Sequence, residues 1–274
     1  MARLLNRRPG RLAAMHLAVA PFLLIVLAYV AGSAVRLAEN PNDKLLPAPA
    51  TFVETAQRMA FEADKRSGDY LLWSDTAASL ERLGIGLAAG VAIGLVLGIA
   101  IGLLPYVTAA LRALVAVVSV VPPLALLPIL FIVFGLGETG KVVLIIVGIA
   151  PFLVRDVALR VGEIPNEQLI KAQTLGASTW QIVTRVVLPQ ILPRLVDAVR
   201  LSLGPAWLFL IASEAIAATD GLGYRIFLVR RYLAMDVIIP YVAWITLLAY
   251  TMDLGLRSLS RRAFPWAVTG DSRS

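Results

Sequence analysis

The sequence predicts an all-α protein that spans a membrane with six transmembrane helices. Its 274 residues are 59% hydrophobic and only 16% charged, and the mean hydropathy is +0.80. Soluble domains are about 45–50% apolar and about 25% charged. Positions 83–111 and 113–137 hold no charged residue at all. Because a helix needs about 20 apolar residues to cross the hydrocarbon core, such blocks predict membrane spans.

Six spans account for the apolar blocks in order along the chain. The fourth and fifth are the most polar at their ends, since only 13 uncharged residues separate Lys141 from Arg155 and 13 separate Arg200 from Glu214. Spans of this kind face protein or a cavity rather than lipid. We expect the six spans at residues 13–35, 83–104, 112–134, 141–160, 195–216 and 238–257.

Two long loops divide the chain. The outer loop contains Pro47-Ala48-Pro49 and then reads as an amphipathic helix from Thr51 to Ala63, with another helix running from Tyr70 into the second span. The inner loop is a polar helical segment. The predicted regions are the N-terminus with the first span (1–35), an extracytoplasmic loop (36–82), a core of five spans (83–260) that includes the inner segment (161–194), and a tail (261–274).

Basic residues at both ends predict which side of the membrane each end occupies. Six spans place both termini on one side, and the positive-inside rule makes that side cytoplasmic. No small-residue cleavage site follows the first apolar block before Arg36, so we expect a retained helix rather than a cleaved signal peptide. The basic residues are Arg3, Arg7, Arg8 and Arg11 at one end and Arg257, Arg261, Arg262 and Arg273 at the other.

Composition argues against most enzymes and against nucleic-acid binding. Cysteine is absent and His16 is the single histidine, which leaves little for metal binding or general-base chemistry. The net charge of +7 comes from residues that flank the apolar blocks, where anionic headgroups attract them. The stretch 135–142 resembles a phosphate-binding loop, but Val142 replaces the hydroxyl residue that would hold magnesium. We therefore expect no catalytic, metal or cofactor site in this chain.

The second span repeats glycine at every fourth position. This spacing allows another helix backbone to approach closely. We interpret the row first as a packing surface, with the lining of a pathway as the less favoured alternative. The glycines are Gly86, Gly90, Gly94, Gly98 and Gly102.

Prolines and one acid mark candidate pathway or gate residues. Pro122, Pro123 and Pro128 remove backbone donors inside the third span and should kink or loosen it. Glu214, after Ser213, lies near the outer end of the fifth span, where an ionisable group needs a partner or a cavity. We weigh a gating role for Glu214 against a structural ion pair with Arg225, Arg230 or Arg231. Asp197 and Arg200 should pair with each other, being three apart on a helix.

The inner loop carries a pattern that resembles the coupling segment of ABC importer permeases. That pattern is Glu-Ala-Ala, three residues, Gly, nine residues, then Ile-x-Leu-Pro. Here a helix, a turn at Gly176, a second helix and a proline stop follow in register, although Ile170 and Lys171 replace the Glu and the first Ala. The candidate ATPase-coupling residues are Ile170, Lys171, Ala172, Leu175, Gly176, Ala177, Ser178, Leu188 and Pro189.

Further motifs resemble the permeases for nitrate, sulfonates, taurine and bicarbonate. They are the stretches 121–128, 134–138 and 213–215, with Gly221-Leu222-Gly223-Tyr224 and Leu46-Pro47-Ala48-Pro49. This resemblance covers about residues 45–266. It implies the type I ABC importer permease fold and a small anionic solute moved into the cytoplasm by alternating access.

The resemblance also implies the partners. We expect a homodimer in the bacterial inner membrane, two cytoplasmic ATPase subunits that bind ATP and magnesium, an extracytoplasmic solute-binding protein and no nucleic acid. An ion-coupled secondary transporter without an ATPase is the alternative, and a membrane-embedded enzyme is a second one. The latter needs a nucleophile and base or a metal set, which the sequence lacks.

Overall fold

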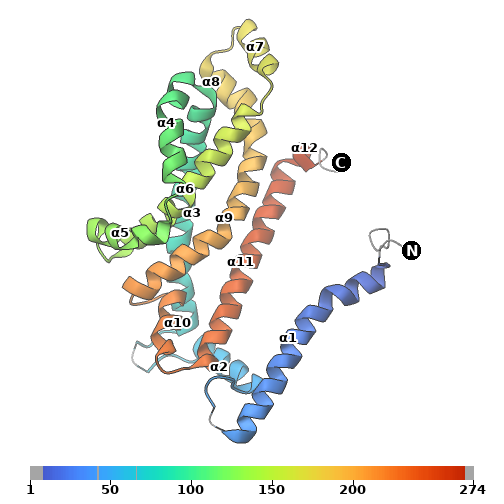
Figure 1. Ribbon diagram of the computed structural model, residues 1–274, viewed down its shortest axis with the longest axis vertical. Helices are drawn as coiled ribbons and strands as arrows, with labels where there is room; N and C mark the ends of the chain where they lie inside the picture. The colour runs from blue at the N-terminus through green and yellow to red at the C-terminus, as the bar shows by residue number, and fades with distance from the viewer. Residues whose placement is uncertain (1–8, 42, 66, 269–274) are drawn as a thin grey trace.

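The computed structural model describes residues 9–41, 43–65 and 67–268, and every regular element within them is a helix (Figure 1). Among these residues, five helices are long and apolar enough to cross a membrane, and a bent pair of helices makes a sixth if the pair counts as one span. This confirms the predicted all-α membrane fold. The five are α1 (Arg11–Glu39), α3 (Leu71–Leu103), α6 (Glu138–Gly162), α9 (Leu188–Ala217), which continues α8, and α11 (Met235–Ala263).

The third span is broken rather than continuous. The helix α4 (Pro105–Val118) and the segment formed by η2 (Pro123–Leu126) and α5 (Leu127–Phe134) meet at an angle of 86°. The predicted kink in the span over 112–134 is therefore present, and the first arm of the span begins earlier than expected, at Pro105. Pro122 and Pro123 lack the N–H groups that would continue α4.

Pro128 does not kink a helix. It lies in the first turn of α5, where backbone N–H groups have no partner within the helix, so the missing donor costs nothing. The expectation that Pro128 loosens the span was wrong for this reason.

The glycine row of α3 packs against α6. A Cβ atom added at any of the five glycines would come within 2.5–2.7 Å of an α6 side chain, closer than real Cβ atoms approach their neighbours. The residues in contact on α6 also recur every fourth position, so their side chains form a ridge that fits the groove left by the glycines. They are Ile145, Ile149, Leu153, Val157 and Val161.

The fourth and fifth spans form the centre of the bundle. Of their most apolar 18-residue windows, 39% is buried in α6 and 50% in the helix that contains α9, against 17% in α11. This confirms that these spans face protein. The contact is close at Gly148, where an added Cβ would overlap the Phe209 ring.

The helix α1 stands apart from the bundle and joins it only near its C-terminal end (Figure 1). There the Tyr29 hydroxyl donates to the Pro47 carbonyl at 2.7 Å, and the Ser33 hydroxyl donates to Leu46 at 3.0 Å. The predicted amphipathic helix follows as α2 (Pro49–Phe61). Only 6% of the apolar window of α1 is buried, so its side chains need lipid or protein around them.

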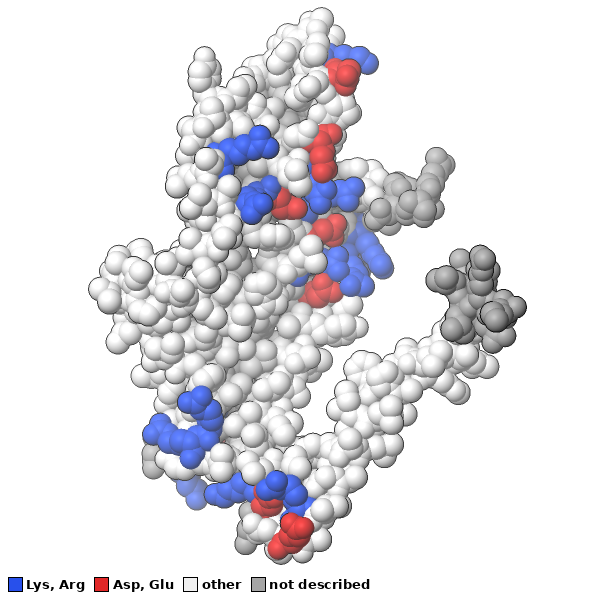
Figure 2. Space-filling model, viewed as in Figure 1, with Lys and Arg blue, Asp and Glu red and all other residues white. Residues whose placement is uncertain are grey.

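Charged side chains gather toward the two ends of the molecule. Figure 2 shows them around the α6, α9 and α11 ends on one side and near α10 (Leu222–Arg230) on the other, while α5 and the middle of α1 (residues 12–35) hold none. This distribution is typical of a protein that crosses a bilayer. Arg3, Arg7, Arg8 and Arg273, on which part of the predicted orientation depends, lie outside the described residues.

Candidate functional site

A helical projection forms one end of the molecule. It consists of α7 (Asn166–Thr174), a turn and α8 (Thr179–Ile182) (Figure 1). Gly176 has φ +80°, and the N–H groups of Gly176 and Ala177 donate to Gln173 and Ala172 at 2.9 and 3.0 Å. These are the two bonds of a Schellman motif, whose left-handed position favours glycine. No neighbour lies within 4 Å of a Cβ added at Gly176, so its backbone angle alone requires glycine.

The projection exposes large apolar side chains. Ile170, Leu175 and Trp180 are 58%, 88% and 73% exposed. Lys171 and Ser178 are exposed as well, while Ala172 and Ala177 are half-buried beneath them. Ser178 also caps α8 through a capping box with Gln181. Apolar side chains gathered on an exposed tip are typical of a protein-binding surface.

The predicted proline stop at the end of this segment was wrong. A π-helical turn η3 (Val183–Val187) joins α8 to α9, and Leu188 and Pro189 begin α9. Pro189 follows the π-helical turn directly and lies inside the longer helix, so its missing N–H does not end the helix. Both residues are half-buried. The projection therefore continues into the fifth span as one 39-residue helix, Thr179–Ala217.

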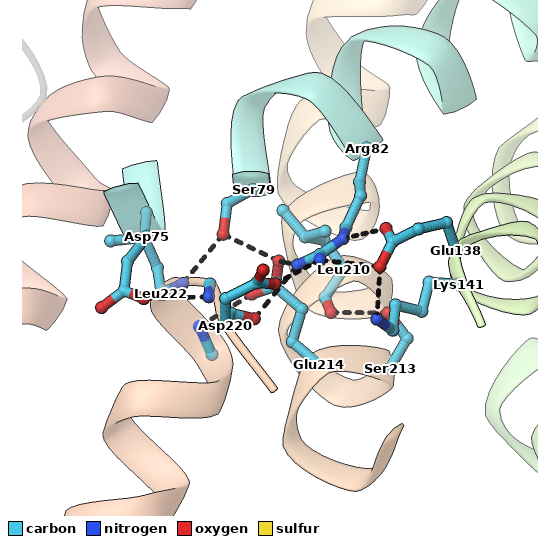
Figure 3. A network of polar contacts seen from close by, with 12 residues as sticks. Asp75, Ser79, Arg82, Glu138, Lys141, Leu210, Ser213, Glu214, Asp220 and Leu222 are labelled. Carbon is cyan, nitrogen blue, oxygen red and sulfur yellow. Dashed lines mark hydrogen bonds and ion pairs between the residues drawn. The ribbon is translucent and has the colours of Figure 1, made fainter. Parts of the chain in front are cut away.

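A buried network of ions, shown in Figure 3, lies beside α10, toward the end of the bundle opposite the projection (Figure 1). Arg82 of α3 is 5% exposed and extends between three carboxylates from different parts of the chain. It donates to Glu138 at 2.9 Å, to Glu214 at 2.9 Å and to the Asp220 carboxylate. Lys141 donates to Glu138 at 2.7 Å. One guanidinium thereby joins α3, α6, α9 and the segment before α10.

Glu214 is fully buried within this network. Its carboxylate accepts bonds from Ser79 at 2.7 Å, from Arg82 and from the Gly223 N–H at 2.8 Å. Of the two alternatives weighed for Glu214, a structural ion pair is present, but its partner is Arg82 rather than Arg225, Arg230 or Arg231, because helix packing brings Arg82 to Glu214. A Cβ at Gly221 would meet the Glu214 carboxylate at 2.5 Å, which explains the glycines of the Gly221-Leu222-Gly223 turn.

A second ion pair adjoins the first. Asp75 of α3 accepts bonds from Arg225 at 2.8 Å, from the Tyr241 hydroxyl at 3.0 Å and from the Gly221 N–H at 3.0 Å. Burial lowers the pKa of Arg225, but the Asp75 carboxylate more than compensates, so the pKa of Arg225 lies above its usual value. Asp75 thus ties α10 and α11 to α3.

The α3 residues of this network were not among the site residues predicted from the sequence. Asp75, Ser79 and Arg82 follow each other at spacings of four and three, which places them on one helix face. That spacing was a usable signal of a polar stripe. The acids that Arg82 binds are too distant in sequence to be identified from it.

A large cavity lies between the halves of the spans that are nearer the projection. It measures about 890 Å³ and is lined by α4, α6, α9 and the end of α3. Of the predicted pathway residues only Pro123 lines it. Ser213 and Glu214 are fully buried elsewhere, and the Ser213 hydroxyl donates to the Leu210 carbonyl at 2.7 Å. The geometry gives Glu214 a structural setting rather than a place along this cavity.

The stretch that resembles a phosphate loop forms no such loop. Lys141 is 3% exposed and lies within α6, bound to Glu138. The Asp197–Arg200 ion pair is present at 3.1 Å, and Arg200 also donates to Asp253 at 2.8 Å. Among the described residues, no group of three or more His, Asp or Glu side chains could hold a metal ion.

Comparison with known proteins agrees with this architecture. The profile of the family described as "Binding-protein-dependent transport system inner membrane component" matches residues 90–264. The taurine transport system permease protein TauC of Escherichia coli K12 is 40% identical over 198 residues, which are 72% of each chain. The putative aliphatic sulfonates transport permease protein SsuC of the same organism is 32% identical over 82% of this chain and 83% of its own.

A solved structure shows the same fold. A chain of the bacterial alginate ABC transporter, crystallised with an alginate pentasaccharide-bound periplasmic protein, superposes with a TM-score of 0.60 at 16% identity. The match covers 93% of this chain and 99% of that one. The expected importer-permease fold is thereby confirmed.

Proposed function

Because the chain belongs to the family of binding-protein-dependent transport system inner membrane components, we propose that it forms the membrane pathway of an ATP-driven importer for a small organic sulfonate. Two copies of the chain enclose the pathway, two ATPase subunits dock on the inner face, and an extracytoplasmic protein delivers the solute. ATP and magnesium are bound by the ATPases. Both termini lie in the cytoplasm.

The exposed apolar projection carries this proposal. A transporter driven by an ion gradient needs no protein surface on its cytoplasmic side, whereas an ATPase-driven permease must receive force there. Leu175 and Trp180 extend from the tip, where they would fill a groove on the ATPase. Because α8 continues into α9 as one helix, a push on the tip moves the fifth span directly.

The two ends of the bundle would have different roles in alternating access, the outer end as a rigid body and the inner end as the part that moves. The Arg82 network and the adjoining Asp75 ion pair together join α3, α6, α9, α10 and α11 at the outer end, so these helices would move as one body. The inner halves carry the 86° break and the cavity, where fewer ionic contacts cross between helices. Closure of the ATPase pair would then rock packed helices about the outer network.

The names of the relatives support a sulfonate as the solute. TauC and SsuC are permeases for taurine and for aliphatic sulfonates. Radiolabelled taurine and ethanesulfonate, offered to liposomes that contain the whole transporter and its binding protein, test this. If ATP drives the uptake of neither compound, the sulfonate assignment is contradicted.

The coupling role is tested by truncating the tip. We expect Leu175→Ala with Trp180→Ala to lower ATP-driven uptake and ATPase co-purification at least about tenfold, since anchors of this kind contribute about 2 kcal/mol or more each. Both side chains are exposed, so the fold should be unaffected. Leu24→Ala, an exposed change on α1, is the matched control. Full co-purification of the ATPase with the double variant would refute the docking role.

A further inference from the structure

The cavity between α4, α6 and α9 contains two arginines that have no acidic partner. Arg112 and Arg155 both line it. Within the described part of the chain, neither guanidinium lies within ion-pair distance of a carboxylate. Three arginines elsewhere in the spans are paired: Arg82 with three acids, Arg160 with Asp156 and Glu163, and Arg200 with Asp253. The cavity therefore holds positive charge that the protein leaves uncompensated.

The spacing of the lining residues shows that each arginine belongs to a helix face directed at the cavity. On α4 the stripe is Thr108, Arg112, Val115 and Ser119, and on α6 it includes Phe152, Arg155 and Leu159. Spacings of three and four place residues on one helix face. Asp156 also lines the cavity, but its carboxylate lies 3.7 Å from Arg160. The net charge facing the cavity is therefore positive.

Two helix prolines indicate that this cavity holds water. Pro151 in α6 and Pro205 in α9 have no N–H, so the carbonyls of Val147 and Leu201 lose their usual α-helical donor. All four residues line the cavity. Freed backbone carbonyls at membrane depth are tolerated where they face water or other donors. A wet cavity also lowers the cost of two unpaired guanidinium groups.

We propose that Arg112 and Arg155 form an anion site in this cavity, which takes the sulfonate or carboxylate group of a small solute. Guanidinium groups bind such oxyanions through paired N–H donors. The site gives the permease a charge selectivity of its own. This inference rests on the proposed transport function for its place in the transport cycle, but its test needs neither ATP nor a binding protein.

The absence of cysteine allows a direct test with charged thiol reagents. Ala116 lines the cavity one helical turn from Arg112, so Ala116→Cys places a thiol beside the site. The full-length protein, in nanodiscs of phosphatidylcholine, is treated with the sulfonate reagent MTSES or the cationic reagent MTSET. Ser67→Cys, exposed on the outer segment, reports the intrinsic reactivity of both reagents.

We expect the MTSES-to-MTSET rate ratio at Ala116→Cys to exceed that at Ser67→Cys at least about tenfold, because a cavity of one charge sign concentrates counter-ions. Arg112→Gln with Arg155→Gln should remove the preference, and the double lysine variant should retain most of it. Arg194→Gln removes an exposed charge of α9 outside this cavity and should change nothing.

Three outcomes would overturn the proposal. One is an equal rate ratio at the two cysteines, and another is the same loss of preference with Arg194→Gln, which would indicate a general surface potential. The third is an Ala116→Cys thiol that neither reagent modifies, which would mean that the cavity is closed. Loss of the preference when phosphatidylglycerol replaces part of the lipid would assign the arginines to lipid headgroups and refute a soluble anion.

Discussion

Arg82 is the residue on which the outer end of the bundle depends. Its guanidinium is buried, and the Glu214 carboxylate that it binds is fully buried as well. A buried ion pair is weak evidence of net stabilisation, but removing one partner leaves an uncompensated charge. The network is therefore sensitive to single substitutions even where its total contribution is modest.

We expect Arg82→Met to lower the free energy of unfolding by about 3–5 kcal/mol, because Glu214 would be left buried without its counter-ion. Unfolding in SDS, followed by circular dichroism, measures the change. Arg200→Met is the matched control. Its partners Asp197 and Asp253 have side chains 51% and 27% exposed, so we expect a loss of about 1 kcal/mol or less. Equal losses in the two variants would argue against a special role for the buried network.

Gly176 is constrained by its backbone conformation rather than by its neighbours. Its neighbourhood is empty, but its φ is +80°. We expect Gly176→Ala to cost about 1–2 kcal/mol locally, since a Cβ disfavours left-handed backbone. The altered tip should reduce ATPase co-purification without loss of the membrane fold. Hydrogen exchange at α7 and α8 checks the local effect, and unchanged exchange there would contradict it.

At the scale of elements, the contact between α3 and α6 is set by the glycine row. Each glycine allows an α6 side chain to occupy the space of a missing Cβ. Close backbone approach of this kind is a main source of helix association in membranes, where lipid is as apolar as the side chains. The two helices should therefore be intolerant of even one added methyl group at these positions.

Gly94 and Gly84 provide a matched pair within α3. A Cβ at Gly94 would lie 2.6 Å from the Leu153 Cβ, whereas nothing lies within 4 Å at Gly84. We expect Gly94→Ala to destabilise by about 1–3 kcal/mol through overpacking, and Gly84→Ala to stabilise by up to about 1 kcal/mol through helix propensity. The same unfolding assay measures both. A destabilising Gly84→Ala would show that glycine is needed in α3 for another reason.

The cause of the bend between α4 and α5 can also be tested. Pro122→Ala with Pro123→Ala restores the missing donors, so we expect the two arms to straighten. Spin labels at Ala109→Cys and Ile132→Cys, both at exposed positions, should move apart by roughly 10 Å, from the rise of about 1.5 Å per residue of a straight helix. An unchanged distance by pulsed EPR would mean that packing, not the prolines, sets the bend.

At the scale of the whole molecule, the projection and the Arg82 network lie at opposite ends of the bundle (Figures 1 and 3). Force that arrives at the tip must therefore travel through α9, the most buried span. The large exposed apolar surface of α1 and α5 requires lipid or a second copy around it.

The proposed orientation makes a simple prediction. A thiol at Ser67→Cys should react with an impermeant maleimide in intact cells, whereas a thiol at Thr174→Cys should react only after the membrane is opened. Both positions are exposed in the structure, so access depends on the side of the membrane. The cysteine-free parent is the blank. The reverse pattern would invert the topology.

Local signals in the sequence determined much of this protein. Charge-free blocks identified the spans, glycine spacing identified the packing face of α3, and the pattern around Gly176 located the inner projection. These features were readable because hydrophobic length, small-residue spacing and left-handed backbone positions are properties of neighbouring residues. The prediction that Pro189 ends the helix was wrong because a π-helical turn joins α8 to α9, and Pro189 lies within the combined helix.

Only the tertiary structure decided which charges meet. Arg82 and Glu214 are 132 positions apart, and Asp75 and Tyr241 are 166 apart. The sequence showed that Glu214 needed a partner, but several arginines were equally available along the chain. The packing of α3 against α6 and α9 selected one of them and left Arg112 and Arg155 facing a cavity without an acidic partner of their own. Pairing over such separations follows from helix packing, which spacing along the chain does not specify.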